Sequence, residues 1–271
     1  MRTHRLALVL LVVAPLLAAE PSPPRATFAS VRGCEVGYRV FDARNPDAPT
    51  VLIAHGYLRN GEHMRGWAQA IVANGLNAVT VDLCASNAPE GRHADNARDL
   101  VALRKRLELD DVIYLGTSAG GLAALLAAAQ DGEATRGVLL LDPTNAGGQA
   151  RAAATRVRVP VAALVSRPQM CNAWRNIDRA LKTLPDATIV SMGRVSHCDF
   201  EWPSDSFCRV ACFHFGSESS SRSQARIHAI ALDYLRALAA GDTRALARWK
   251  ASIAHRGGMD DADDATLEVF R

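Results

Sequence analysis

The segment DVIYLGTSAGGLAALL, residues 111–126, joins a short apolar run to a leucine- and alanine-rich run through a serine flanked by glycines. The first run predicts a strand buried on both faces, and the second predicts a helix. Between them, residues 116–120 match G-x-S-x-G, which in a strand–turn–helix setting holds a serine at the apex of a sharp turn. Glycines at 116 and 120 remove Cβ atoms that would clash where strand and helix cross. We therefore predict that Ser118 is a nucleophile.

Strand and helix patterns alternate along the rest of the chain. The strands are predicted at residues 35–41, 50–54, 78–83, 112–115, 137–141, 161–165 and 188–192. The helices are predicted at residues 62–73, 93–107, 119–130, 172–181 and 224–240. This alternation predicts an α/β fold with a mostly parallel central sheet flanked by helices.

The first residues have the pattern of an export signal. A basic start is followed by an apolar run at residues 6–17 and by the small residues Ala18 and Ala19, as in secretory signals. The run is shorter than the roughly 20 residues of a membrane span, although an uncleaved anchor is the alternative. We expect a signal peptide at residues 1–19, a flexible leader at 20–30, a catalytic domain at 31–240 and a C-terminal helix and tail at 241–271. The mature protein is then secreted or periplasmic, without a stable membrane span.

The charge balance and the cysteines narrow the class of protein further. A formal net charge of +3 gives no electrostatic reason to expect a nucleic-acid partner. All six cysteines follow the predicted signal, and an even number in an exported chain favours disulfides. Their 15 possible pairings stay open. Cys208 and Cys212 are four residues apart with histidines nearby, so a metal site is the alternative that we consider weaker.

A second motif lies 63 residues before Ser118, where the strand predicted at 50–54 runs into His55-Gly56-Tyr57. Together with the serine motif, it resembles the α/β-hydrolase family, and the aromatic residue resembles its chlorophyllase and cutinase-like, dienelactone-hydrolase-related branch. The resemblance covers most of residues 35–240. It implies an oxyanion hole formed by the backbone N–H groups of Tyr57 and Ala119. His55 precedes the serine, against the chain order of the family, and is expected to brace the loop.

The family order of serine, acid and histidine places the general base after Ser118. His197 follows the last predicted strand through a short loop, which is where the family has its histidine. His214, just after the cysteine pair, is the second candidate. His228 falls inside a predicted helix and His255 in the tail, so both fit less well.

The acid departs from the commonest family pattern. The loop after residues 161–165 reads SRPQMCN and contains no carboxylate. Asp142 ends the preceding strand, an arrangement that resembles the chlorophyllases and the platelet-activating-factor acetylhydrolases. We predict Asp142 as the acid that orients His197. Asp178 and Asp199 are alternatives, and Asp142 could instead cap a turn.

The resemblance implies an exported serine hydrolase of carboxylic esters, esterase- or lipase-like, with no cofactor and no metal. Only residues 143–158 separate two predicted strands where many lipases insert a lid, so we expect no large cap domain and an open site for a small-molecule or polymeric ester. Some secreted polyester hydrolases have a disulfide comparable to one from Cys171 to a cysteine of the loop after His197. A peptidase or amidase on the same fold, or a non-catalytic binding protein on a hydrolase scaffold, are the alternatives.

Overall fold

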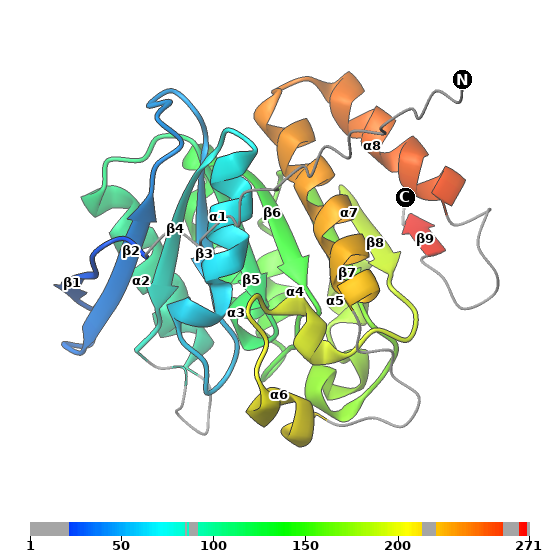
Figure 1. Cartoon of the computed structure of the whole chain (residues 1–271), viewed down its shortest axis with the longest axis horizontal. Helices are drawn as coiled ribbons and strands as arrows, with labels where there is room; N and C mark the ends of the chain where they lie inside the picture. Colours follow the sequence, from blue (N-terminus) through cyan, green and yellow to red (C-terminus); the bar gives the residue numbers. More distant parts are fainter. Residues whose placement is uncertain (1–21, 85, 87–91, 213–220, 257–265, 270–271) are drawn as a thin grey trace, which may run out of the picture.

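The computed structural model describes residues 22–84, 86, 92–212, 221–256 and 266–269 of the chain. Within them, nine strands form one sheet in the order β1-β2-β4-β3-β5-β6-β7-β8-β9 (Figure 1). The strands are β1 (Ala26–Ala29), β2 (Glu35–Phe41), β3 (Thr50–Ala54), β4 (Asn77–Asp82), β5 (Val112–Thr117), β6 (Thr135–Leu141), β7 (Val161–Val165), β8 (Ala187–Ser191) and β9 (Thr266–Val269). The strands from β3 to β8 are parallel to one another, and β1, β2 and β9 pair in antiparallel fashion at the two sides.

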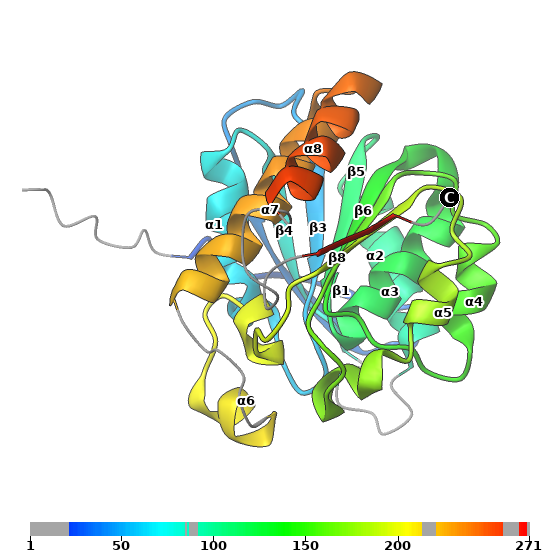
Figure 2. The same ribbon diagram turned by 90° about the vertical axis from the view of Figure 1, so that its right-hand side faces the viewer.

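Helices cover both faces of the sheet (Figure 2). One face packs against α1 (Arg65–Ala73), α7 (Ser221–Ala239) and α8 (Thr243–Arg256). The other face packs against α2 (His93–Arg106), α3 (Ala119–Asp131), α4 (Gln149–Ala154) and α5 (Asp178–Leu181). The remaining short helices are η1 (Gly61–Met64), η2 (Gly132–Ala134), η3 (Met170–Arg175), η4 (His197–Phe200) and α6 (Ser206–Ala211).

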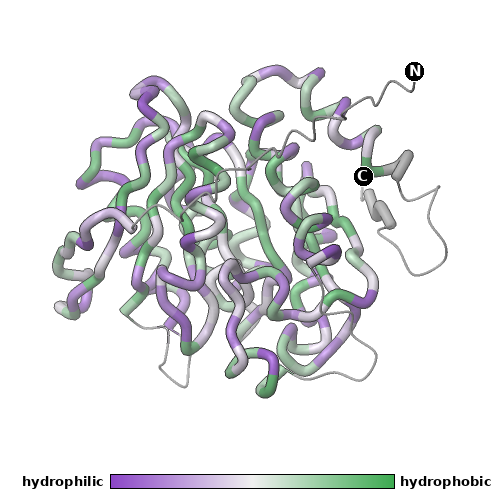
Figure 3. Tube along the Cα trace, in the orientation of Figure 1, coloured by the Kyte–Doolittle hydropathy of each residue, from purple (hydrophilic) through white to green (hydrophobic). Residues whose placement is uncertain are grey.

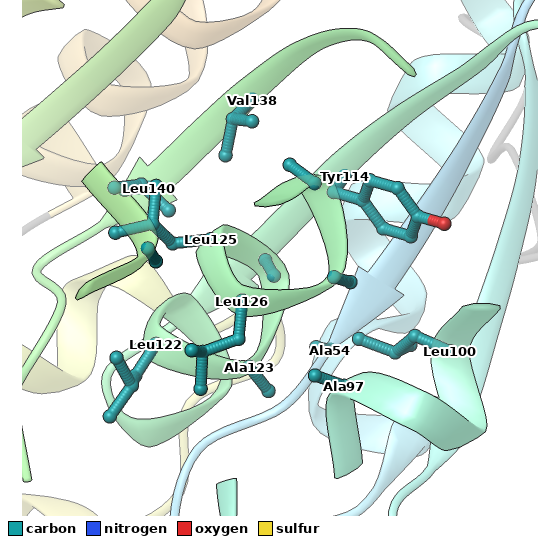
Figure 4. Close-up of a cluster of buried hydrophobic side chains, with 14 of the residues drawn as sticks. Ala54, Ala97, Leu100, Tyr114, Leu122, Ala123, Leu125, Leu126, Val138 and Leu140 are labelled. Carbon is teal, nitrogen blue, oxygen red and sulfur yellow. The ribbon is translucent and has the colours of Figure 1, made fainter. Parts of the chain in front are cut away.

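The central strands are mostly apolar, as is typical of strands that are buried on both faces. In β3, Leu52 and Ala54 join the cluster under α2 and α3, whereas Val51 and Ile53 join the cluster under α1 and α7. Figure 4 shows the first cluster, with leucines of α3 against the sheet, and Figure 3 shows the hydrophobic colour that follows the central strands. Each buried valine, leucine or isoleucine stabilises the fold by roughly 1.5–3 kcal/mol through burial.

The structure confirms the predicted architecture. Every predicted strand is present, and the ends of the observed strands differ from the prediction by at most two residues. The connection from β6 to β7 contains only α4, so the expected absence of a large cap at this point is confirmed. The carboxyl ends of β3, β5, β6 and β8 lead directly into the loops that carry the predicted site residues.

Three segments differ from expectation. The leader expected to be flexible contains β1, which pairs with β2. Because β1 has only four residues and lies at the edge of the sheet, its sequence pattern is too short to predict a strand. After residue 241 the expected helix is present as α8, and the strand β9 pairs with β8. The helix predicted at 172–181 is wrong, because Ala173 and Trp174 have left-handed backbone inside η3 and only the short α5 follows.

The predicted signal peptide and its cleavage site lie outside the described residues. Among the helices that the structure describes, none combines the length and the apolar character needed to cross a bilayer.

Candidate active site

Ser118 lies at the turn between β5 and α3, and its backbone has a φ of 54° and a ψ of −120°. This conformation is rare for a residue with a side chain and costs on the order of 1–3 kcal/mol. A Cβ added at Gly116 would collide with the Gly120 carbonyl, and one added at Gly120 would collide with the carbonyls of Ala54 and His55. The two glycines therefore allow β5, α3 and the end of β3 to meet, as the sequence predicted.

The structure brings His197 and Asp142 together. Their separation in sequence is 55 residues, yet His197 Nδ1 lies 2.6 Å from Asp142 Oδ2, at hydrogen-bond distance. Asp142 follows β6 and is fully buried, whereas His197 begins η4 after β8. A buried carboxylate that accepts from Nδ1 fixes the ring tautomer and leaves Nε2 as a proton acceptor.

The alternative acids make other contacts. Asp178 forms an ion pair with Arg175 at 2.8 Å, and Asp199 accepts a hydrogen bond from the Ser196 amide at 3.1 Å, which caps η4. Among the described carboxylates, Asp142 is the one that His197 contacts.

The alternative bases lie elsewhere or outside the described structure. His228 is in α7, where its ring stacks on Trp202 at a centroid distance of 3.9 Å, and burial lowers its pKa to about 4. His214 and the side chain of His255 lie outside the described residues.

Ser118 and His197 line the same pocket, a cavity of about 270 Å³. Within the described structure no hydrogen bond joins the hydroxyl to the ring, and in sites without substrate such bonds are often long. Tyr57, Leu58 and Phe207 line the pocket and are each between 44% and 59% exposed. The wall is completed by Gly56, Arg59, Cys171, Glu201, Cys208, Ala211 and Cys212.

Arg59 and Glu201 form an ion pair at the pocket wall. Arg59 Nη2 lies 2.6 Å from Glu201 Oε2, and both side chains are only 6% exposed. Arg59 also contacts Asp205 at 3.0 Å, and these two carboxylates raise its pKa against the opposing effect of burial. The pair links the loop after β3 to the loop after His197, so it holds two walls of the pocket in place.

The amides of Tyr57 and Ala119 donate no hydrogen bond to the described part of the protein. The carbonyls of the same peptide units are bound: Gly56 O lies 2.8 Å from His55 Nδ1, and Ser118 O accepts from Gly121 N at 3.0 Å and Thr144 N at 3.2 Å. Since N–H and C=O point in opposite directions in a trans peptide, these bonds fix the direction of both N–H groups.

His55 braces the loop after β3, as expected. The Leu83 amide donates to His55 Nε2 at 2.9 Å, so Nδ1 carries the proton that it donates to Gly56 O. The ring is 1% exposed, and desolvation lowers its pKa to about 4. Both nitrogens are occupied, so His55 has no free lone pair for catalysis.

The lowered pKa of His55 predicts a loss of stability in mild acid. The unfolded chain binds a proton near pH 6.5 and the folded chain only near pH 4, so this stabilisation is complete above about pH 6.5 and is lost as the pH falls toward 4. A shift of this size corresponds to about 3 kcal/mol. Urea unfolding between pH 7.5 and 4 measures it, with His228 contributing in the same direction. In His55→Gln the free energy of unfolding should fall less steeply between pH 7.5 and 4. An equally steep fall would contradict the assignment of this pH dependence to His55.

Disulfides join the cysteines into three pairs: Cys34–Cys84, Cys171–Cys212 and Cys198–Cys208. The expected bridge from Cys171 to the loop after His197 is confirmed. Two disulfides therefore hold α6, one that joins Cys198 to Cys208 within the helix and one that joins Cys171 of η3 to Cys212 directly after it. The sulfurs of Cys198, Cys208 and Cys212 lie within 4.8 Å of one another, but each is already bonded to a partner sulfur, which disfavours the metal alternative.

Removal of the Cys171–Cys212 bridge is expected to lower the free energy of unfolding. The bridge spans 41 residues of chain, and closing a loop of this length stabilises by roughly 2–4 kcal/mol. Urea unfolding of the double variant Cys171→Ser and Cys212→Ser measures this loss in the free energy of unfolding. The oxidised wild type and the fully reduced wild type are the references. An unchanged midpoint would show that α6 is held without the bridge.

Comparison with known proteins was made on sequence and on structure. No family model matches the chain, and no curated protein matches it. Among solved structures, a dienelactone hydrolase from Anabaena variabilis is 20% identical, with a TM-score of 0.59 over 80% of this chain and 98% of that one. The chain has the α/β-hydrolase fold.

Two further α/β-hydrolase structures agree with this assignment. A thermophilic esterase from Thermogutta terrifontis is 14% identical, with a TM-score of 0.56 over 80% of this chain and 99% of that chain. An enol-lactonase from Burkholderia xenovorans is 13% identical, with a TM-score of 0.53 over 62% and 91%. At these identities the likeness establishes the fold, and the chemistry of this chain must be argued from its own side chains.

Sequence reasoning missed the groups that surround Asp142. Ser166 donates to it from its backbone N at 2.9 Å and from its Oγ at 2.8 Å, and Asn172 Nδ2 lies 3.3 Å from Oδ1. Both residues come from the loop after β7, which we had noted only for having no carboxylate. The signal available in the sequence was the presence of Ser166 and Asn172, two polar residues in the loop that follows β7.

Proposed function

We propose that this protein is a serine hydrolase that cleaves carboxylic esters through Ser118, His197 and Asp142. The observation that carries the proposal is the 2.6 Å contact between buried Asp142 and the Nδ1 atom of His197, in a pocket that Ser118 also lines. The solved structures of similar fold include enzymes described as an esterase, an enol-lactonase and a dienelactone hydrolase, which supports ester chemistry here.

The geometry supports an acyl-enzyme mechanism. His197 Nε2 takes the proton of Ser118 as Oγ attacks the ester carbonyl, and Asp142 stabilises the imidazolium that forms. The negative charge on the carbonyl oxygen is received by the Tyr57 and Ala119 amides, whose directions are fixed from the carbonyl side. His197 then returns the proton to the leaving alkoxide, and the acyl-serine is hydrolysed when His197 activates a water in the same way.

The pocket indicates the size of the acyl group. A cavity of about 270 Å³ is at the small end of ligand sites, and Tyr57, Leu58 and Phe207 give it an apolar wall that is open to solvent. We propose a short acyl chain inside the pocket and an alcohol portion, small or polymeric, that extends outside it.

Three disulfides and the apolar N-terminal run support a proposed location in the periplasm or outside the cell. Disulfides persist in oxidising compartments and are rare in a reducing cytosol.

A fluorophosphonate probe tests the proposal directly. We expect the probe to modify Ser118, identified by peptide mass spectrometry, and the labelled protein to lose its turnover of p-nitrophenyl butyrate. The matching p-nitroanilide should be hydrolysed far more slowly, whereas a preference for the anilide would favour an amidase. A folded protein with neither labelling nor turnover would favour a non-catalytic scaffold and overturn the proposal.

A further inference from the structure

The loop after β7 takes the place where many family members have their acid, and here it supplies hydrogen-bond donors instead. The carboxyl ends of β6 and β7 lie side by side, since Leu141 pairs with Leu164 and the Asp142 amide donates to Leu164 O at 2.7 Å. Donors on the β7 loop can therefore reach a carboxylate at the end of β6.

Asn172 uses the two ends of its side-chain amide for different tasks. Its Oδ1 accepts from the backbone amides of Gln169 at 2.9 Å and Arg175 at 3.2 Å. Backbone N–H groups can only donate, so these two bonds fix which end is oxygen. The Nδ2 end then faces three acceptors, which are Arg167 O at 2.9 Å, Ser166 Oγ at 3.0 Å and Asp142 Oδ1 at 3.3 Å.

The Ser166 hydroxyl is oriented by the same network. It receives hydrogen bonds from Asn172 Nδ2 at 3.0 Å and from Gln169 Nε2 at 2.5 Å. A hydroxyl has two acceptor sites and one hydrogen, so with both acceptor sites occupied its hydrogen is available to Asp142 Oδ2, 2.8 Å away. Asp142, Ser166, Asn172 and Gln169 are all at most 3% exposed, so water does not substitute for these donors.

The backbone of this loop is strained where it presents Asn172. Ala173, Trp174 and Arg175 have φ values of 50°, 55° and 56°, and left-handed conformations cost non-glycine residues about 1 kcal/mol each or more. Asn172 Oδ1 and the neighbouring Cys171–Cys212 disulfide hold this conformation in place. Strain that surrounding bonds enforce is a mark of a functional position.

We infer that Asn172 is a positioning residue for the proposed reaction, one that holds the ionised Asp142 carboxylate directly and through the Ser166 hydroxyl so that Asp142 can orient His197. This inference rests on the proposed function and extends it to a residue that touches no substrate.

Besides His197, the charged side chains that line the pocket are Arg59 and Glu201, which pair with each other.

Asn172→Asp is the decisive variant. It keeps an oxygen for the Gln169 and Arg175 amides. It replaces the donor end, which also bonds to Arg167 O, with a carboxylate oxygen beside Asp142. Two adjacent carboxylates share one proton. Below neutral pH that proton can stand in for the lost N–H, and at higher pH the two negative charges repel. Asn172→Ala loses both ends of the side chain and has no such titration.

We expect kcat for p-nitrophenyl butyrate, per site titrated with fluorophosphonate, to fall about ten- to a hundredfold in Asn172→Asp at pH 8 with KM nearly unchanged, as for loss of hydrogen bonds to a charged group. The ratio of its kcat to the wild-type kcat should fall as pH rises, whereas the ratio for Asn172→Ala should stay flat. Asn176→Asp is the matched control, because Asn176 lies on the same loop and its side chain bonds to the backbone of Asn145 instead of to Asp142.

A purely structural role predicts the opposite result. The isosteric Asn172→Asp would then keep wild-type kcat per titrated site at every pH, and Asn172→Ala would lose only folded protein. That outcome, with Ser118→Ala inactive, would overturn the inference and leave the proposed function intact. Turnover that survives Ser118→Ala would overturn the proposed function itself.

Discussion

Ser118→Ala is expected to abolish ester hydrolysis, with a loss in kcat on the order of 10⁵–10⁶-fold, as when the nucleophile of a serine hydrolase is removed. The variant has no oxygen to attack the carbonyl, and the oxyanion amides and His197 can then only assist direct attack by water. The measurement is turnover of p-nitrophenyl butyrate, followed long enough to separate residual activity from spontaneous hydrolysis.

The same variant should fold normally. Ser118 bonds to the rest of the protein through its backbone, which alanine retains, so the urea midpoint should stay near that of the wild type. A folded Ser118→Ala protein with a tenth or more of wild-type turnover would show that another group carries the chemistry.

Asp142→Asn is expected to lower kcat about 10⁴-fold near neutral pH. The change preserves size, but an amide NH₂ facing His197 Nδ1 favours the wrong ring tautomer, and the imidazolium loses its buried counter-charge. Fluorophosphonate labelling should slow by a similar factor, because it requires the same proton transfer from Ser118.

Asp178→Asn is the matched control for that substitution. Asp178 was an alternative acid in the sequence, and in the structure it pairs with Arg175. We expect it to keep turnover within about twofold of wild type, as for most substitutions at partly exposed ion pairs. If Asp178→Asn is inactive and Asp142→Asn is active, the acid has been assigned to the wrong strand.

The features that were predictable from sequence are those that a short, contiguous stretch of residues determines. The strand, glycine-flanked Ser118 and helix are contiguous, and His55-Gly56 follows directly on a buried strand. The contact between Asp142 and His197 was predictable because the position that is commoner in the family has no carboxylate in this chain. In each case a short stretch of chain determines the backbone, and the parallel sheet brings the strand ends together.

The features that were not predictable depend on tertiary contacts. The strand β1 exists because β2 offers it a partner, and the kink after Asn172 exists because a side-chain oxygen and a disulfide hold left-handed backbone that the helix pattern concealed. The donors to Asp142 come from residues 24 and 30 positions away. Their contact with Asp142 can be recognised only when β6 and β7 are known to be neighbours in the sheet.

The positive φ of Ser118 has a consequence for engineering. Glycine adopts that backbone conformation without penalty. The substitution Ser118→Gly, which deletes the hydroxyl, should therefore leave the fold as stable as the wild type or make it more stable. A directed-evolution screen that rewards heat resistance alone will drift toward inert proteins at position 118. Thermal selection of this protein therefore has to be coupled to a readout of the proposed activity in every round.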